Sequence, residues 1–182
     1  MTAKPILLIS TDALADLSPW EDLAKSRQWS EFFSHIGDAA PRDNGVADLI
    51  ELVSAERPAF VMYTSRWDAA HRPETLAWLE ANGLPRRSMW LRTRRELAPE
   101  IVTERHATLA ISKLGARPVL VIEQDPALAE TLRARGLAVV TPDQLPASVK
   151  GLRTLLATAP RPLPARLIPK PVVVETPEKV SK

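Results

Sequence analysis

The sequence predicts an α/β fold in three layers, a Rossmann-like parallel β-sheet with helices on both of its faces. Four short segments, at residues 6–10, 59–64, 118–123 and 137–142, are mainly aliphatic, and amphipathic segments separate them. Strands without a polar face are typical of parallel sheets that are covered on both sides. Their alternation with helical segments indicates the crossover connections that parallel strands need.

The N-terminal part of the chain begins with the strand at 6–10 and continues into a helical region. Ser18 is the expected N-cap of the first helix, because Pro19 follows it at the first helical position. A second helix is expected at about 46–55, and it leads into the strand at 59–64.

The rest of the chain repeats the pattern of strand and helix. A helix at 73–82 is expected to end at Gly83, since glycine readily adopts the left-handed conformation that closes many helices. The other expected elements, in order, are a strand at 88–92, a helix at 99–115, the strand at 118–123, a helix at 126–136 and the strand at 137–142.

The position of a functional site follows from this arrangement. In open parallel sheets, ligands bind beyond the carboxyl ends of the strands. The segments to consider are therefore 10–16, 64–67 and 123–125, which follow three of the expected strands.

Composition excludes several classes of protein. The 182 residues suffice for one domain with an appendage. Cysteine is absent, which excludes disulfides and thiolate metal sites, and no apolar run is long enough to cross a membrane. The first residues do not resemble a secretory signal. We expect a cytoplasmic protein that does not contact membranes.

The chain divides into an α/β domain at 1–157 and a C-terminal tail at 158–182. The tail holds six of the 17 prolines and no glycine, so it is expected to be extended. It carries five Lys/Arg and two Glu, and the high pI is therefore a property of the tail. Two interpretations stay open, a disordered basic tail and an arm that contacts a protein partner or a second copy of the chain.

The segment "YTSRWDAAHRPETLAWLEANGLPRRSMWLR", residues 63–92, resembles the phosphatase domain of phage-type polynucleotide kinases, which belongs to the haloacid dehalogenase (HAD) superfamily. That family has a strand ending in T-G-R, then a helix with R-x-x-T-x-x-W-L, then a strand ending in Arg. Thr64, Ser65 and Arg66 fall on the first motif, and the resemblance extends over roughly residues 5–142. It implies a HAD-like fold with a minimal cap.

The resemblance also implies a chemistry. In the family, an aspartate attacks phosphorus, and a second aspartate two residues later acts as general acid and base. A hydroxyl and a lysine hold the phosphate, and carboxylates complete a Mg²⁺ site. Here Ser10 stands at the nucleophile position and Asp12 at the acid–base position; the alternative register places Ile9 and Thr11 there, so neither register contains D-x-D.

The remaining positions of the family pattern are only partly kept. Thr64, Ser65 and Arg66 match the phosphate-binding motif, but the position of the lysine holds Glu104. The last motif of the family is a pair of adjacent acids. In this chain Glu123 keeps the first acid, Gln124 stands in place of the second, and Asp125 follows one residue after that position. If the site is active, the resemblance implies Asp12 and Thr64 as catalytic residues and Asp12, Glu123 and Asp125 as Mg²⁺ ligands. Alternatively, Glu123 and Asp125 cap the helix that follows them.

These departures predict a HAD-like domain that has lost phosphatase activity, needs no cofactor, and serves as a binding or assembly module through its tail. An alternative is a divergent Mg²⁺-dependent phosphatase for phosphate monoesters, including nucleic-acid 3′-phosphates. A third possibility is binding of nucleic-acid ends without chemistry. The arginines that would carry such binding are Arg66, Arg86, Arg87 and Arg94.

Overall fold

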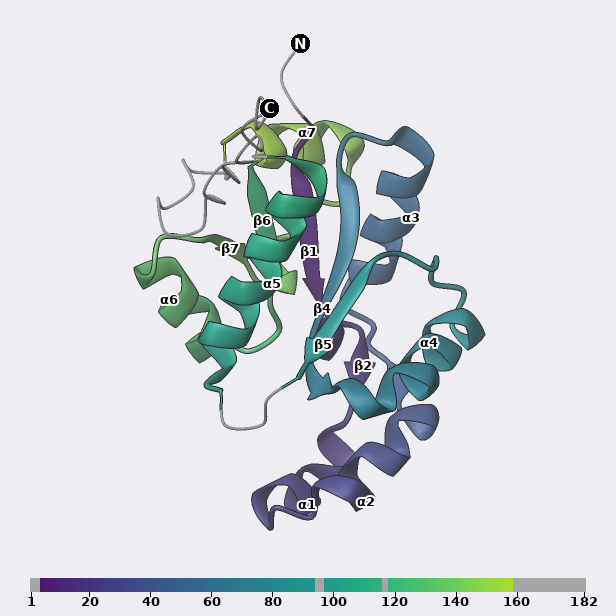
Figure 1. Cartoon of the computed structure of the whole chain (residues 1–182). Helices are drawn as coiled ribbons and strands as arrows, with labels where there is room; N and C mark the ends of the chain where they lie inside the picture. The colour runs from purple at the N-terminus through teal and green to yellow at the C-terminus, as the bar shows by residue number, and fades with distance from the viewer. Residues whose placement is uncertain (1–3, 94–96, 116–117, 159–182) are drawn as a thin grey trace, which may run out of the picture.

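The computed structural model describes residues 4–93, 97–115 and 118–158. Its centre is a five-stranded sheet in the order β5-β4-β1-β6-β7, in which every neighbouring pair is parallel (Figure 1). This confirms the parallel α/β sheet that the aliphatic segments predict. The strands are β1 (Ile6–Ser10), β4 (Phe60–Asp68), β5 (Met89–Arg92), β6 (Val119–Ile122) and β7 (Ala138–Val140).

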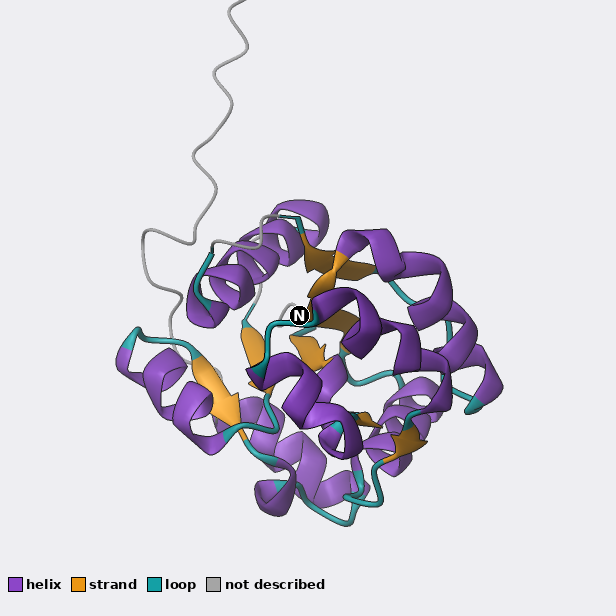
Figure 2. Ribbon diagram, turned by 90° about the horizontal axis from the view of Figure 1, so that it is seen from below, coloured by secondary structure: helices purple, strands orange, loops and turns teal. Residues whose placement is uncertain are grey.

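Helices cover both faces of the sheet, as the view along the strands shows (Figure 2). On one face, α3 (Val46–Glu56), α4 (Arg72–Ala81) and α7 (Val149–Thr158) contribute to one cluster of buried side chains. On the other face, α5 (Pro99–Leu114) and α6 (Pro126–Ala134) contribute to a second cluster. The three predicted layers are therefore present.

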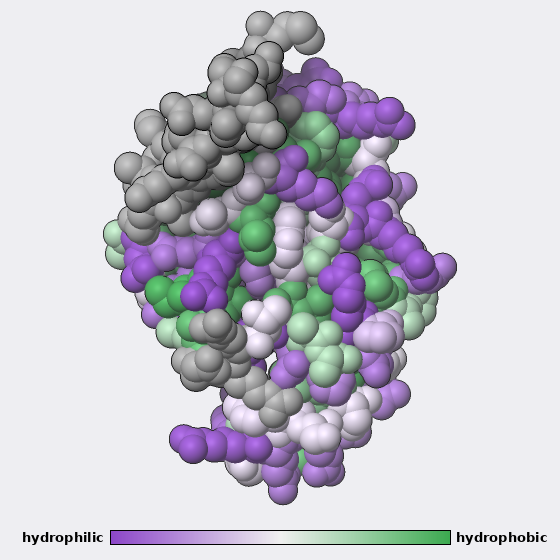
Figure 3. Space-filling model, viewed as in Figure 1, coloured by the Kyte–Doolittle hydropathy of each residue, from purple (hydrophilic) through white to green (hydrophobic). Residues whose placement is uncertain are grey.

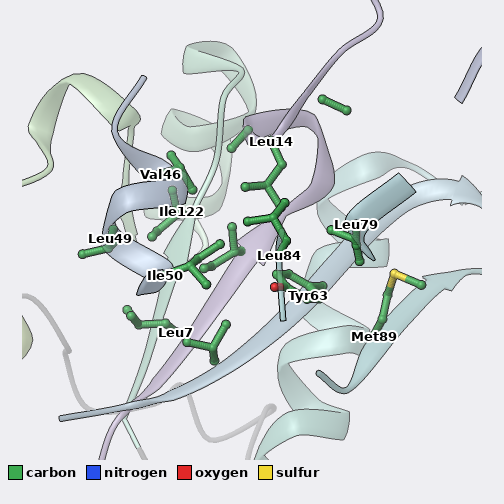
Figure 4. Close-up of a cluster of buried hydrophobic side chains, with 14 of the residues drawn as sticks. Leu7, Leu14, Val46, Leu49, Ile50, Tyr63, Leu79, Leu84, Met89 and Ile122 are labelled. Carbon is green, nitrogen blue, oxygen red and sulfur yellow. The ribbon is translucent and has the colours of Figure 1, made fainter. Parts of the chain in front are cut away.

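Strand β1 explains why both faces must be covered. Leu7 and Ile9 belong to the first cluster, whereas Ile6 and Leu8 belong to the second, as expected when successive side chains of a strand point to opposite faces. None of these four side chains is exposed to solvent. Figure 4 shows Leu7 among the α3 side chains, with Tyr63 of the neighbouring strand close by.

A small insertion follows β1 and lies at the carboxyl end of the sheet (Figure 1). Two short antiparallel strands, β2 (Ala15–Asp16) and β3 (Ala40–Pro41), form its base. Between them lie α1 (Glu21–Lys25) and α2 (Trp29–Ser34), flanked by single 3₁₀ turns at 18–20 and 35–38. We call residues 15–41 the cap. Its small size agrees with the minimal cap that the resemblance implies.

In the cap, the first helix begins later than the sequence predicts. Ser18 is not an N-cap but the first residue of a 3₁₀ turn, and its backbone amide donates a hydrogen bond to the side chain of Asp16 at 3.1 Å. Helix α1 ends after five residues, and Arg27 has a left-handed φ of 60° between the two short helices. Helix α2 is held against the domain by Phe33, whose ring centre lies 5.0 Å from that of His71 beside α4.

Other elements agree with the sequence within a few residues. Gly83 has the expected left-handed φ, 72°, after α4. Strand β4 continues to Asp68, four residues beyond the expected end at residue 64. The motif residues 64–66 therefore lie within the strand. Helix α7 was not predicted, and its last residue is Thr158. The tail at 159–182 lies outside the described residues, so the division at 157/158 stays a prediction.

Within the described part of the chain, no helix combines the length and the apolar character that a membrane crossing requires.

Helix α7 offers a test of the packing. Leu152 is fully buried in the first cluster, so Leu152→Ala should lower the free energy of unfolding by about 2–5 kcal/mol through the cavity it leaves. Leu109, which is 46% exposed on α5, provides the control, and Leu109→Ala should change stability by about 0.5 kcal/mol or less. Urea unfolding measures both. Equal losses from the two variants would contradict the packing of α7 against the domain.

Candidate functional site

The ends of three adjacent strands place most of the expected site residues together under the cap. Ser10 is the last residue of β1 and pairs with Thr64 of β4 in the parallel register. Glu123 directly follows β6, the other neighbour of β1. The parallel sheet therefore brings the segments 10–16, 64–67 and 123–125 to one edge, as the sequence predicts.

An ion pair between Asp12 and Arg66 occupies the middle of this edge. The Nε of Arg66 donates to Oδ2 of Asp12 at 2.8 Å, and Nη2 lies 2.7 Å from the same oxygen. The indole Nε1 of Trp67 donates to the other oxygen, Oδ1, at 2.9 Å. Both carboxylate oxygens of Asp12 therefore already accept hydrogen bonds from protein donors.

Two further acids lie around the Arg66 guanidinium. Its Nη1 is 3.9 Å from Oδ2 of Asp125. The charge of Asp12 raises the pKa of Arg66, and the charges of Glu123 and Asp125 act in the same direction. The acids that the resemblance implies as metal ligands therefore surround an arginine side chain.

Glu123 is almost completely buried, with 1% of its surface exposed. Burial raises the pKa of its carboxyl well above the ordinary value, and the nearby charge of Asp12 adds to this rise. The charge of Arg66 lowers this pKa in part, and so do two hydrogen bonds, from the Asp125 backbone amide to Oε1 at 3.2 Å and from the Ser10 hydroxyl. Ser10, at the nucleophile position, is itself only 1% exposed and thus faces a buried carboxyl.

Asp125 caps helix α6. Its Oδ1 accepts hydrogen bonds from the backbone amides of Ala127 at 3.0 Å and Leu128 at 3.3 Å. The capping interpretation of this residue is therefore confirmed. The other carboxylate oxygen, Oδ2, lies near the guanidinium of Arg66.

The hydroxyls of Thr64 and Ser65 are buried and engaged within the protein. Oγ1 of Thr64 lies 2.7 Å from Nδ1 of His106 on α5. Oγ of Ser65 accepts from the Thr11 hydroxyl at 2.7 Å and from the Trp67 amide at 3.1 Å. The assignment of both residues to phosphate binding stays a prediction, and these contacts are what a phosphate would have to compete with.

His106 is a residue that sequence reasoning missed, because the histidines show no metal-ligand spacing and none of them lies close to Ser10 in the sequence. Burial lowers the pKa of His106 to about 4, although a hydrogen bond with the backbone of Leu91 opposes the shift. The imidazole is therefore neutral at pH 7 and links α5 to β4 and β5. A single buried histidine on an apolar helix face was the available signal.

Glu104, at the position of the family's lysine, faces away from the strand ends. Its carboxylate pairs with Arg135 in a bidentate manner, with Oε1 2.9 Å from Nε and Oε2 2.6 Å from Nη2. Arg135 follows the last turn of α6, the end opposite to Asp125. The acid therefore joins α5 to α6 and does not lie beside Arg66.

Asn44 is a second residue that sequence reasoning missed. Its Nδ2 donates to Oε1 of Gln124 at 3.0 Å and to the carbonyl of Ala13 at 2.9 Å. Its Oδ1 accepts from the Val46 amide at 3.2 Å, at the start of α3. Asn44 thus fixes Gln124 and the turn after β1. The D-N-G turn before α3, residues 43–45, was the local signal for such a side chain.

The residues at this edge do not fit the Mg²⁺ ion that the resemblance implies. Magnesium requires nearly octahedral oxygen ligands. Among the described residues, no group of three His, Cys, Asp or Glu side chains could hold a metal ion. The geometry gives the reason, since Asp12 is held by Arg66 and Trp67, and Oδ1 of Asp125 is held by α6.

Two adjoining hollows lie between the cap and the strand ends, where the surface is indented above the cap (Figure 3). They have volumes of about 400 and about 370 Å³, and Asp12, Arg66 and Phe32 line both. The first hollow is lined by four aromatic rings together with charged side chains, and several other charged and amide side chains line the second. The rings are Trp29, Phe32, Phe33 and Trp67, and the polar lining includes Arg42, Gln124 and Asp125.

The other arginines considered for nucleic-acid binding lie elsewhere. Arg86 pairs with Glu80 of α4 at 2.5 Å. Arg87 lines a different hollow, together with Phe60 at the start of β4, whereas Arg66 lies near the other end of that strand. Arg94 lies outside the described residues. A basic surface formed by these residues stays a prediction.

The chain was compared with family models, curated protein sequences and solved structures. No family model and no curated protein sequence matches this chain. Solved structures do match. A chain of a Pnkp1/Rnl/Hen1 complex is 13% identical with a TM-score of 0.59 over 78% of this chain. A protein described as a β-phosphoglucomutase from Thermotoga maritima is 14% identical with a TM-score of 0.56 over 85%. The HAD domain of the effector Lem4 from Legionella pneumophila is 12% identical with a TM-score of 0.51 over 87%.

The chain has the HAD-like fold. It spans 99% of the Thermotoga protein and 96% of the Lem4 domain, but only 46% of the Pnkp1-complex chain. At these low identities the likeness establishes the HAD-like fold alone. The chemistry at the strand ends must be argued from the side chains that this chain places there.

The buried imidazole generates a prediction on pH dependence. His106 has a pKa of about 4 in the fold and about 6.5 when unfolded, so the unfolded chain binds more protons between these values. Its contribution is fully present above about pH 6.5 and is lost as the pH falls toward 4, by about 3 kcal/mol in total.

The variant His106→Asn isolates this effect from that of the carboxylates. Urea unfolding from pH 7 to pH 4 should show a smaller loss of stability for the variant than for the wild-type protein. Identical losses would show that His106 is not buried as a neutral imidazole.

Proposed function

We propose that this chain is a HAD-like domain that does not hydrolyse phosphate esters and that acts as a binding or assembly module. The observation that carries the proposal concerns two residues, one at the end of β1 and one in the turn that follows it. Ser10 provides a buried hydroxyl in place of the attacking carboxylate, and Asp12 is held by Arg66 and Trp67. The Glu123 carboxyl is a base in contact with Ser10, but both side chains are only 1% exposed, and a serine attacks phosphorus only when the substrate also reaches it.

Two other features support the loss of hydrolysis. The position of the family's lysine holds Glu104, which pairs with Arg135, so no lysine is supplied there to neutralise a phosphate. The acids at the strand ends surround Arg66 and do not form a site that fits Mg²⁺. Transfer of a phosphoryl group without a metal ion or a lysine would leave its developing charge poorly compensated.

The hollows beneath the cap support a binding role. Each is within the size range of small-molecule sites, and aromatic rings and hydrogen-bonding groups line them side by side. Arg66 is already paired with Asp12, and Arg42 with Asp16 at 3.0 Å. The lining is therefore suited to a ligand that does not depend on a phosphate group.

The tail supplies the assembly part of the proposal. Its proline content and net positive charge suit an extended arm that contacts an acidic partner or a second copy of the chain. At each edge strand of the sheet, an arginine side chain donates a hydrogen bond to a backbone carbonyl. Arg72 donates to Met89 of β5 and Arg133 donates to Val139 of β7, both at 2.9 Å. Strand addition to this sheet would have to displace these bonds.

A phosphatase assay tests the loss of hydrolysis. With Mg²⁺, the full chain should release no phosphate from p-nitrophenyl phosphate or from a 3′-phosphorylated oligonucleotide above the rate without protein. The variant Asp12→Ala is the matched control. Phosphate release that Asp12→Ala abolishes would overturn this part of the proposal and establish the divergent phosphatase instead.

Light scattering on the full chain tests the role of the tail in self-association. If the tail joins two copies, replacement of Val172, Val173 and Val174 by Ser should shift the protein toward the monomer. If the wild-type protein forms oligomers to the same extent as this variant, the tail segment at residues 171–174, "PVVV", is excluded as the contact between copies.

A further inference from the structure

A hollow of about 430 Å³ lies at the end of the sheet that faces away from the cap. It is found where β1 and β4 begin, since it is lined by Phe60, the first residue of β4, and by Lys4, which comes shortly before β1. The backbone amide of Phe60 donates to the Pro5 carbonyl at 2.9 Å and holds the two segments together. Figure 1 shows both strands starting on the side opposite to the cap. This hollow shares no lining residue with the two hollows under the cap.

We propose that this hollow binds a small organic phosphate that carries a planar ring, the chemical class of a free nucleotide. The guanidinium groups of Arg57 and Arg87 hold the phosphate, and the phenyl ring of Phe60 stacks on the planar ring. The site lies apart from the strand ends under the cap, so it does not depend on whether the domain hydrolyses phosphate esters.

The first argument is charge. Lys4, Arg57 and Arg87 all line the hollow, and none of the described residues around it is acidic. Arg87 donates to the Ser54 hydroxyl at 3.5 Å, and neither arginine forms an ion pair with a described residue, whereas Arg66 under the cap is paired with an aspartate. A guanidinium can hold phosphate through two parallel hydrogen bonds. The two arginines therefore favour a ligand with a phosphate group.

The second argument is the backbone conformation of Arg57. Helix α3 ends at this residue with a left-handed φ of 52°. Helices α4 and α6 are followed by glycines with left-handed φ, Gly83 at 72° and Gly136 at 91°. A residue with a Cβ is strained in this conformation, and Pro58 adds to the strain because a residue before proline is normally extended. Such strain is concentrated at binding and active sites, so an arginine here indicates a role for its side chain.

The third argument is the apolar part of the hollow. Phe60 is 37% exposed, and the buried side chains of Val53, Ala59 and Val61 line the hollow beside it. A planar ring can stack on a phenyl ring and cover such a surface, whereas inorganic phosphate would leave it in water. The volume is within the range of small-molecule sites. The hollow therefore matches a ligand that combines an anionic group with a planar ring.

Isothermal titration calorimetry of the full chain with adenosine 5′-diphosphate (ADP), in buffer without divalent cations, tests the proposal. The wild-type protein should bind one ADP. Arg87→Gln and Arg57→Gly should each weaken binding by about tenfold or more, because each removes a charge-assisted hydrogen bond to phosphate. Phe60→Leu should weaken the binding of ADP and leave that of inorganic pyrophosphate unchanged, because it removes only the ring that stacks.

Arg86→Gln is the matched control, because Arg86 is next to Arg87 in the sequence but pairs with Glu80 and does not line the hollow. It should bind ADP as the wild type does. Arg57→Gly carries a second measurement, since glycine relieves the left-handed conformation and should leave the Tm equal to or above that of the wild type. Weaker binding by this variant is then not a result of unfolding.

Four results would overturn the proposal. The first is a wild-type protein that binds no ADP, and the second is an equal loss in Arg86→Gln, which would indicate non-specific attraction of anions. The third is ADP binding that Arg57→Gly and Arg87→Gln leave intact, which would place the ligand elsewhere on the domain. The fourth is tighter binding of a hexaglutamate peptide or an oligothymidylate than of ADP, with the same dependence on the two arginines. That result would assign the hollow to an acidic protein or to single-stranded nucleic acid instead.

Discussion

The ion pair between Asp12 and Arg66 is the interaction on which the carboxyl edge of this domain depends. It joins the turn after the central strand β1 to the end of the neighbouring strand β4, and Trp67 fixes its orientation. Because the pair is only partly exposed, its carboxylate is costly to leave without a partner. Asp12 and Arg66 also line both hollows beneath the cap, so one interaction stabilises the edge and shapes the space where a ligand would lie.

The position of that pair follows from the burial of β1. Its side chains are divided between two clusters, so helices must cover both of its faces, and in the sheet β1 lies between β4 and β6. A turn that leaves such a strand emerges at the carboxyl edge, beside the ends of β4 and β6. The cap begins in the same turn and is fastened through the Trp78 indole, which donates to the Ala39 carbonyl at 2.7 Å. The site is therefore enclosed by a segment close to it in sequence.

Much of the fold could be predicted from the sequence because a strand buried on both faces has a strong local signal. The segment at 6–10 shows this, and its residues are all buried. The cap and α7 could not be predicted as well. In the cap, a left-handed Arg27 and aromatic packing outweigh the helical pattern. In α7, the stabilising contact of Leu152 is with distant parts of the chain, which a local pattern does not contain.

The sequence by itself determined the parallel sheet, the edge at which the site lies, and the absence of D-x-D after β1. These depend on residue type and on the alternation of strand and helix. Only the tertiary structure decided what the side chains at that edge contact. It pairs Asp12 with Arg66, turns Glu104 toward Arg135, and directs Thr64 to His106. Such pairings join residues far apart in the chain, and their geometry exists only after the strands are aligned.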